Sequence, residues 1–386
     1  MTNNTNTTAI GLDISNNYIK AIQLKKLQKK IRLTGAGKLP LEPGLFKDGE
    51  ILKPAELAKA VMLVLNKPIF GTFLNRNINV SLTENLSFIK LIQIDKTPNN
   101  LTDIIEGEIE KNIPFALDEI YYDWQEINTD ASTHNVIIVA APKKNIEQYL
   151  SFFDALKMEV NAIETESIAT CRALLSEERE VSPKSEKNYA IIDIGSSSSS
   201  IIIYSKGMIA FSLSISFSGN EITEKISRVL EVSALQAEKA KIILGFDPSS
   251  AKGIIASIAQ ENIDILLNRI KHALVYFEEN FPQNGKVEKI ILTGGGAYTK
   301  HLDNIIATNT GISTEKGLPM TSIEIKPDDL AKIFSESYKL DAEFFGKKNN
   351  VSAANSNLLS LKQESSLSFA VAIGLALRDL YAPMDL

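Results

Sequence analysis

The sequence predicts an α/β fold of two duplicated domains around a cleft, and three short segments carry that prediction. Two of them are strand–turn–strand segments with an Asp at the end of the first strand: residues 10–20 (IGLDISNNYIK) and residues 190–203 (AIIDIGSSSSSIII). The third, residues 290–297 (IILTGGGA), is an apolar strand that runs into three glycines. The first two segments lie about 180 residues apart and each opens a three-strand run, which indicates an internal duplication.

The turns in these segments have the composition of anion-binding loops. Asp ends a strand, while Gly, Ser and Asn allow a tight turn and offer backbone N–H and hydroxyl donors to an anion. Each segment alone is weak, because the run Ser196–Ser200 could be a linker and the glycine turn could be an ordinary one. The serines, however, are flanked directly by apolar strand-like runs at 189–194 and 201–204. The three segments together predict a phosphate clamp in a nucleotide cleft.

Composition narrows the class of protein. The chain has 386 residues, enough for several domains, and its net charge of −6 argues against a general nucleic-acid binder. The single cysteine, Cys171, allows no intrachain disulfide and fits a reducing compartment. The histidines are scattered, without metal-ligand spacing, and no apolar run reaches the length of a membrane span. We therefore expect a soluble, cytoplasmic protein.

The order of predicted strands and helices suggests where the domains begin and end. We expect the following units: a disordered tail at 1–8, a first domain at 9–178 with an inserted ββαββα unit at 79–159, a linker near 178–187, a second domain at 188–366 that ends in a polar loop from residue 339, and a closing helix at 367–386 that packs back on the first domain.

These segments resemble the actin/Hsp70/hexokinase superfamily over nearly the whole chain. Asp13 with its turn is similar to the first phosphate motif of that superfamily, residues 193–197 to the second, and residues 292–297 to the adenosine motif. Residues 164–172 and 369–377 resemble the two helices that connect the domains. The resemblance implies an actin-like ATPase fold.

The inserted unit lies where the FtsA and PilM families carry their extra subdomain, so the chain resembles this branch of the superfamily. Its closing segment FAVAIGLALR is similar to the last helix of the PilM family of type IV pilus assembly proteins. FtsA usually continues into a basic amphipathic helix, which the short segment after residue 380 does not supply. The resemblance therefore favours PilM over FtsA.

The resemblance implies ATP and Mg²⁺ as ligands. Asp13 and Asp193 would hold a hydrated Mg²⁺ through water, and Glu164 and Glu166 would orient a hydrolytic water or else cap the helix that follows them. Ser15 stands where the superfamily usually has Gly, which changes the geometry of the first turn. The implied phosphate contacts are Ser15, Asn16, Asn17, Gly195, Ser196, Ser197 and Ser198. The implied nucleoside contacts are Gly294, Gly295, Gly296 and Ala297, together with Glu238 and Lys241, for which a solvated helix face is an equal alternative.

By resemblance, the function is that of an ATP-binding scaffold with weak or absent ATPase activity, peripheral to the inner membrane through a partner. The implied partner is the cytoplasmic N-terminal tail of a single-span PilN-like membrane protein, with pilus motor ATPases and self-association left open. This tail would bind in an apolar groove of the present protein. The candidate groove residues, which could equally be core residues, are Ile89, Leu91, Ile104 and Ile109. The alternatives are an FtsA-like filament protein and a small-molecule kinase, although we find no clear acceptor-binding residues for the kinase.

Overall fold

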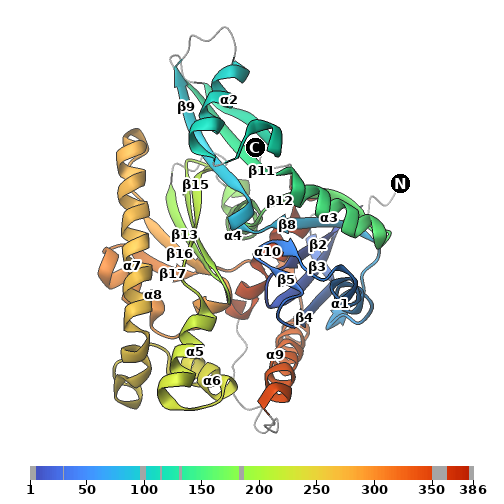
Figure 1. Ribbon diagram of the computed structural model, residues 1–386, viewed down its shortest axis with the longest axis vertical. Helices are drawn as coiled ribbons and strands as arrows, with labels where there is room; N and C mark the ends of the chain where they lie inside the picture. The colour runs from blue at the N-terminus through green and yellow to red at the C-terminus, as the bar shows by residue number, and fades with distance from the viewer. Residues whose placement is uncertain are drawn as a thin grey trace.

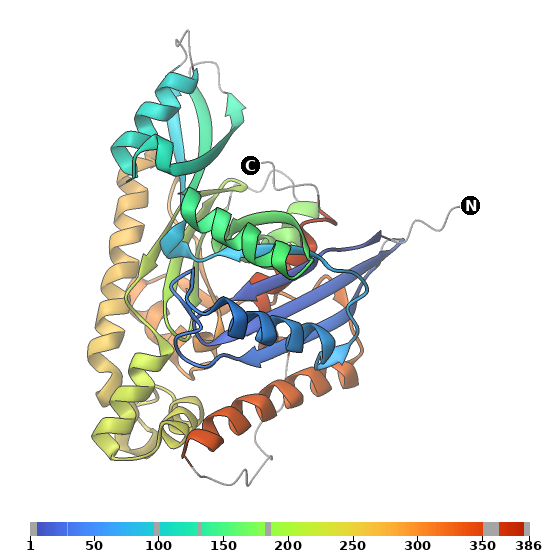
Figure 2. The same cartoon turned by 45° about the vertical axis from the view of Figure 1, so that its right-hand side comes forward.

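The computed structural model of the protein contains two large β-sheets that stand side by side, with helices around and between them (Figures 1 and 2). It describes residues 6–28, 30–95, 101–113, 115–129, 133–181, 187–349 and 363–381. No helix within these ranges is long and apolar enough to cross a membrane.

The first sheet has the order β12-β8-β2-β3-β4-β18, with β1 paired to β3 and β7 paired to β4. Strands β2, β8 and β12 are parallel, and β2, β3 and β4 form an antiparallel meander. Its strands are β1 (Asn6–Thr7), β2 (Ile10–Ile14), β3 (Tyr18–Leu27), β4 (Lys30–Pro40), β7 (Phe70–Gly71), β8 (Asn77–Leu82), β12 (Glu159–Thr165) and β18 (Ile323–Glu324). A separate ribbon pairs β5 (Phe46–Lys47) with β6 (Glu50–Ile51). Residues 6–7, expected in a disordered tail, are thus paired to β3, whereas residues 1–5 lie outside the described residues.

The second sheet has the order β10-β11-β9-β15-β14-β13-β16-β17, in which β13, β16 and β17 are parallel. Its strands are β9 (Phe88–Asp95), β10 (Ile120–Thr129), β11 (Thr133–Pro142), β13 (Asn188–Ile194), β14 (Ser199–Ser205), β15 (Met208–Ile215), β16 (Lys289–Thr293) and β17 (Ser313–Lys316). A single residue pair, Phe211 opposite Lys90, joins β15 to β9.

Helices cover both faces of each sheet. The α-helices are α1 (Pro54–Asn66), α2 (Leu101–Asn112), α3 (Lys143–Ala155), α4 (Glu166–Val181), α5 (Gly219–Leu230), α6 (Ala234–Leu244), α7 (Ile254–Asn280), α8 (Leu302–Thr310), α9 (Pro327–Asn349) and α10 (Ala370–Leu377). The 3₁₀ segments are η1 (Glu84–Leu86), η2 (Leu117–Glu119), η3 (Ser250–Gly253), η4 (Pro282–Asn284), η5 (Gly295–Tyr298) and η6 (Gln363–Phe369). Helices α1 and α3 share one core with the first sheet, and α5 and α7 share another with the second. Residues 339–349, expected in a polar loop, continue helix α9 instead.

The elements expected in the inserted unit are divided between the two sheets. Strand β8 and helix α3 pack with the first sheet, because β8 is an inner strand between β2 and β12 and is buried along most of its length. Strands β9, β10 and β11 with helix α2 enclose a separate core and project at the top of Figure 1. We therefore propose a narrower inserted unit, residues 84–142. The groove candidates Ile89, Leu91 and Ile109 are buried core residues, and Ile104 is partly buried against that separate core.

Helix α10 is clamped between the first sheet and helix α4. A Cβ on Gly11 of β2 would lie 2.1 Å from the carbonyl oxygen of Ala372, and a Cβ on Gly374 would lie 1.8 Å from that of Ala169. Glycine is required at both positions because backbones approach more closely there than any side chain allows. The opposite face of α4 packs on the second sheet through Ile168, Cys171 and Leu175. The two helices therefore connect the two sheets.

Candidate functional site

The two Asp-containing turns lie opposite each other and touch. The backbone N–H of Ser15 donates to the carbonyl of Tyr18 at 2.9 Å, and that of Gly195 donates to the carbonyl of Ser198 at 3.0 Å, so each turn is closed by its own backbone. Between the turns, Asn17 Nδ2 donates to Ser196 Oγ at 2.8 Å. Residues 179 positions apart in the chain thus join the two turns, and the region behind this contact, which contains Asp13 and Asp193, is called the cleft below.

The floor of the cleft is formed by strand ends. Asp13 lies near the carboxyl end of β2, Glu84 just after β8, and Glu166 just after β12, three parallel neighbours in the first sheet. In the second sheet, Asp193 on β13 stands opposite Thr293 at the end of the parallel strand β16. In open α/β sheets, the carboxyl ends of parallel strands are where ligands bind. The topology therefore gathers acidic side chains from both sheets at one place.

Lys20 supplies a cation to this acidic site. It stands opposite Asp13 across the β2–β3 hairpin, and its Nζ lies 2.9 Å from Asp13 Oδ2. Burial alone would lower the pKa of Lys20, but the negative charges of Asp13, Asp193 and Glu166 raise it above its ordinary value. The lysine therefore remains charged in the cleft.

The acids of the cleft are harder to ionise than they would be in water. The pKa of Asp193 is raised to about 6, chiefly by burial, while the charge of Lys20 lowers it and that of Asp13 raises it. Burial likewise raises the pKa of Glu166 well above its usual range, and the charges of Asp13 and Asp193 add to that rise. Burial also raises the pKa of Glu84 to about 7. The acids outnumber the ammonium group, so the site favours the arrival of a cation.

The glycine turn after β16 packs under the second Asp turn. Gly294 has a φ of +78°, and a Cβ there would lie 2.2 Å from Asp193 Oδ1, while a Cβ on Gly296 would lie 2.1 Å from Ile194 Cγ2. Ala297 is fully buried in the core of the second sheet. Gly295 is exposed and has open space where a Cβ would stand. Internal packing thus accounts for Gly294, Gly296 and Ala297, and Gly295 is the residue of this turn that is open to a ligand.

Lys241 is buried, so the solvated-face alternative is wrong for this residue. Its Nζ donates to the carbonyl of Gly219 at 2.9 Å, to Thr223 Oγ1 at 2.8 Å and to Glu238 Oε2 at 2.7 Å. Glu238 is partly exposed and also accepts from Thr223. Lys241 and Gly296 line the same small enclosed cavity beneath the cleft. The lysine therefore secures the start of α5, which carries Gly219 next to the second turn.

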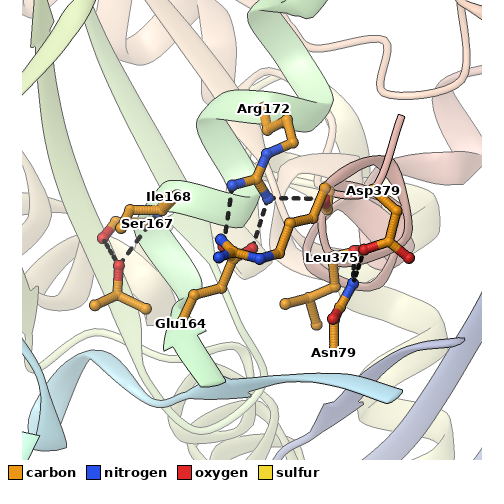
Figure 3. A network of polar contacts seen from close by, with 10 residues as sticks. Asn79, Glu164, Ser167, Ile168, Arg172, Leu375 and Asp379 are labelled. Carbon is orange, nitrogen blue, oxygen red and sulfur yellow. Dashed lines mark hydrogen bonds and ion pairs between the residues drawn. The ribbon is translucent and has the colours of Figure 1, made fainter. Parts of the chain in front are cut away.

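Glu164 departs from the expectation that it faces the cleft. Its Oε1 accepts from Arg172 Nη1 at 2.5 Å, and its Oε2 accepts from Arg172 Nη2 at 3.0 Å and from Arg378 Nη1 at 2.8 Å (Figure 3). Arg172 Nη1 also donates to the carbonyl of Gly374 at 2.9 Å. Both carboxylate oxygens are thus used where α4 meets α10. Nor does Glu164 cap α4, since the N–H of Ile168 donates to Thr165 Oγ1.

Sequence reasoning overlooked two charged residues of the cleft, Lys20 and Glu84. For Lys20 the signal was available, because pairing the strands of the first hairpin around its turn sets Lys20 opposite Asp13. Glu84 follows an apolar strand directly, but nothing in the sequence indicates that this strand lies beside β2.

Comparisons with known proteins agree with this architecture. The family described as type IV pilus assembly protein PilM matches residues 11–342. Cell division protein FtsA of Buchnera aphidicola subsp. Baizongia pistaciae is 24% identical over 260 residues, or 60% of this chain and 59% of that protein. FtsA of Borreliella burgdorferi is 23% identical over 255 residues, or 60% of each chain. The match thus spans about three fifths of the length of these curated relatives.

Among solved structures, a chain of the PilM-PilN type IV pilus biogenesis complex is similar to this one with a TM-score of 0.75 and 21% identity. The match covers 97% of this chain and 99% of that chain. The prediction of an actin-like ATPase fold is confirmed.

Proposed function

The chain belongs to the family of type IV pilus assembly protein PilM, and on that premise we propose that it is an ATP-binding scaffold of the inner-membrane platform that assembles the pilus. One observation carries the ATP-binding part of this proposal. The two Asp turns meet across a cleft through Asn17 and Ser196, and Asp13 and Asp193 stand behind them. Two facing turns of this composition can hold a chain of phosphates between them.

The residues of the cleft fit Mg²⁺ as well as ATP. Carboxylate oxygens are the ligands that Mg²⁺ prefers, and the excess of acidic groups favours a divalent cation. Asp13 and Asp193 would hold the ion through water, and the turns with Ser15, Asn16, Ser197 and Ser198 would hold the phosphates. The bound ion would neutralise phosphate charge.

ATP acts in this proposal as a conformational ligand rather than as a rapidly consumed substrate. With Glu164 held by two arginines, Glu166 is the remaining candidate for orienting a water. Burial raises the pKa of Glu166, and the charges of Asp13 and Asp193 raise it further. Because the junction between α4 and α10 engages one of the two candidate acids, the arrangement supports weak or absent turnover.

The proposed partner is the cytoplasmic N-terminal tail of a single-span PilN-like membrane protein. The similar solved chain comes from a complex described as PilM-PilN, and the present chain carries a projecting unit with its own core, residues 84–142. A cytoplasmic protein held at the membrane by such a tail needs no spanning helix of its own.

The proposal is tested with Asp193→Ala and a matched control, Asp264→Ala, which removes an exposed Asp from the distant helix α7. Wild type and control should bind MgATP and retain a small single-span protein from detergent-solubilised membranes of the source cells when MgATP is present. Asp193→Ala should lose both. If wild type retains a tubulin-like protein instead and sediments with nucleotide, the FtsA-like alternative is supported in place of the pilus scaffold.

A further inference from the structure

Glu84 occupies the point where the nucleotide cleft, the second sheet and the projecting unit meet. It is the first residue of η1, which follows β8 of the first sheet and leads within a few residues into β9 of the projecting unit. The residue is 9% exposed, and its Oε1 accepts a hydrogen bond from Ser212 Oγ on β15 of the second sheet. Burying a carboxyl group costs folding free energy unless hydrogen bonds offset the lost hydration, so a role for Glu84 at this position is worth seeking.

The contact lies at the seam between the projecting unit and the second sheet. Strand β9 meets β15 at one residue pair, Phe211 opposite Lys90, immediately beside Ser212. The bond between Glu84 and Ser212 lies beside this short pairing, and Leu91 of β9 packs in the core of the second sheet next to it. A shift of η1 would therefore move β9 relative to the second sheet.

Two routes connect η1 to the cleft. The first is electrostatic, because the charge of Asp193 raises the pKa of Glu84, and Ser167 at the start of α4 lies beside the Glu84 carboxyl. The second is contact: Asn16 of the first turn exchanges two hydrogen bonds with Asp48, at 2.9 and 2.7 Å. Next to Asp48, Gly49 packs so closely on η1 that a Cβ would lie 2.2 Å from Leu86 Cδ1.

We propose that Glu84 is a positioning residue that transmits the nucleotide state of the cleft to the seam between β9 and β15, and so to the projecting unit. When phosphates and a divalent cation enter beside Asp193 and Asn16, the charge around Glu84 and the position of the Asp48–Gly49 loop both change. The bond to Ser212 then carries that change to β9. This inference rests on the proposed function, since it specifies how ATP regulates the unit that receives the partner.

The test measures hydrogen exchange of the full-length protein with and without MgATP, in the backbone amides of residues 88–95 and 208–215. In wild type, MgATP should slow exchange at this seam by about 5-fold or more, the lower end of typical couplings between sites. Ser212→Ala, which removes the hydroxyl at a residue outside the cleft, should reduce the effect to less than about 2-fold while still binding MgATP. Glu84→Gln, which removes the charge, should reduce the effect equally when measured at saturating MgATP. Ser212→Thr, which keeps the hydroxyl, should restore it, and Glu288→Gln, an exposed site, should behave as wild type.

Each outcome decides a separate claim. If wild type binds MgATP and the seam does not respond, or if Ser212→Ala and Glu84→Gln respond as wild type does, the role of Glu84 is refuted and the proposed scaffold stands. If wild type does not bind MgATP, measured separately by calorimetry, the proposed function fails and the inference fails with it. If Ser212→Thr behaves like Ser212→Ala, the hydroxyl is not the transmitting group, and the inference is refuted in that form.

Discussion

The buried cluster around Glu164 gives a prediction that separates a structural role from a catalytic one. Glu164→Gln keeps the shape of the side chain but removes the charge that faces Arg172 and Arg378. The Arg172 side chain is 2% exposed and that of Glu164 4%, so the guanidinium of Arg172 would be left buried without its counter-charge. Removing one partner of a buried pair costs about 3 to 5 kcal/mol of unfolding free energy.

Glu324 offers a matched control elsewhere in the chain. Its two carboxylate oxygens also accept from two cationic side chains, Lys30 and Arg32, each at 2.7 Å. The geometry resembles that of Glu164, but Glu324 is 42% exposed, so water and salt screen its charge. Glu324→Gln should therefore leave stability nearly unchanged.

Urea unfolding followed by far-UV circular dichroism, together with MgATP affinity at a temperature where both variants are folded, checks the prediction. We expect a large loss of stability in Glu164→Gln, none in Glu324→Gln, and MgATP binding in both. Equal losses in the two variants would show that burial does not decide the strength of these pairs. A Glu164→Gln variant of full stability with impaired nucleotide binding would return Glu164 to the cleft.

Three further predictions concern the cleft and its support. Glu84→Gln should stabilise the protein at neutral pH. Burial raises the folded pKa of Glu84 from 4.5 to about 7, with the hydrogen bonds of Ser212 and Ser167 opposing and the charge of Asp193 adding to the rise. Wild type therefore loses about 3 kcal/mol of stability as the pH rises from 4.5 through 7, at about 1.36 kcal/mol per pKa unit. Urea unfolding of both proteins at pH 5 and pH 8 checks this, and a difference between them that does not grow with pH would contradict it. Gly294→Ala should lower the free energy of unfolding by more than about 1 kcal/mol, because this position has a positive φ and no room for a Cβ. Gly295→Ala should change that free energy by less than about 0.5 kcal/mol but weaken MgATP binding. Thermal melts and calorimetry check this, and equal behaviour of the two variants would contradict it. Lys241→Met should cost about 2 kcal/mol or more in urea unfolding, since three buried or partly buried acceptors lose their charged donor, and an unchanged midpoint would refute this.

The features that sequence predicted well are those encoded within a few residues. The two Asp turns and the strand before the glycines are local patterns of alternating strand, small residue and turn, and the structure has strands at each of these positions. Their family resemblance then supplied the fold, because the order and spacing of the turns hold over the whole chain. Lys20 was within reach of the same local reasoning through the hairpin register.

The features that sequence missed depend on contacts between distant segments. Strands β8 and β9 are separated by five residues, yet one belongs to the first sheet and the other to the second, and no local pattern distinguishes them. Residues 339–349 are polar enough to suggest a loop, but they extend a helix that begins at Pro327 and packs under the first sheet through Ile333 and Phe334. Glu164 and Glu166 are only two residues apart in the sequence. Their different surroundings depend in part on Arg378, which lies 214 positions from Glu164 and binds it at the connecting helices.

The contrast between Glu164 and Glu166 suggests which part of the protein stays fixed and which part responds to a ligand. At Glu164, arginines from α4 and from the segment after α10 neutralise the charge, so the junction between the sheets is compensated without any ligand. At Glu166, two residues away, burial raises the pKa, and the charges of Asp13, Asp193 and Glu84 raise it further against the opposing Lys20. A divalent cation bound with the proposed nucleotide would act on the second region, where acidic groups outnumber the cationic one, whereas the carboxylate of the first is already paired. An actin-like protein built in this way would combine a fixed junction with a ligand-sensitive cleft, which the proposed scaffold, regulated by ATP binding rather than by rapid turnover, requires.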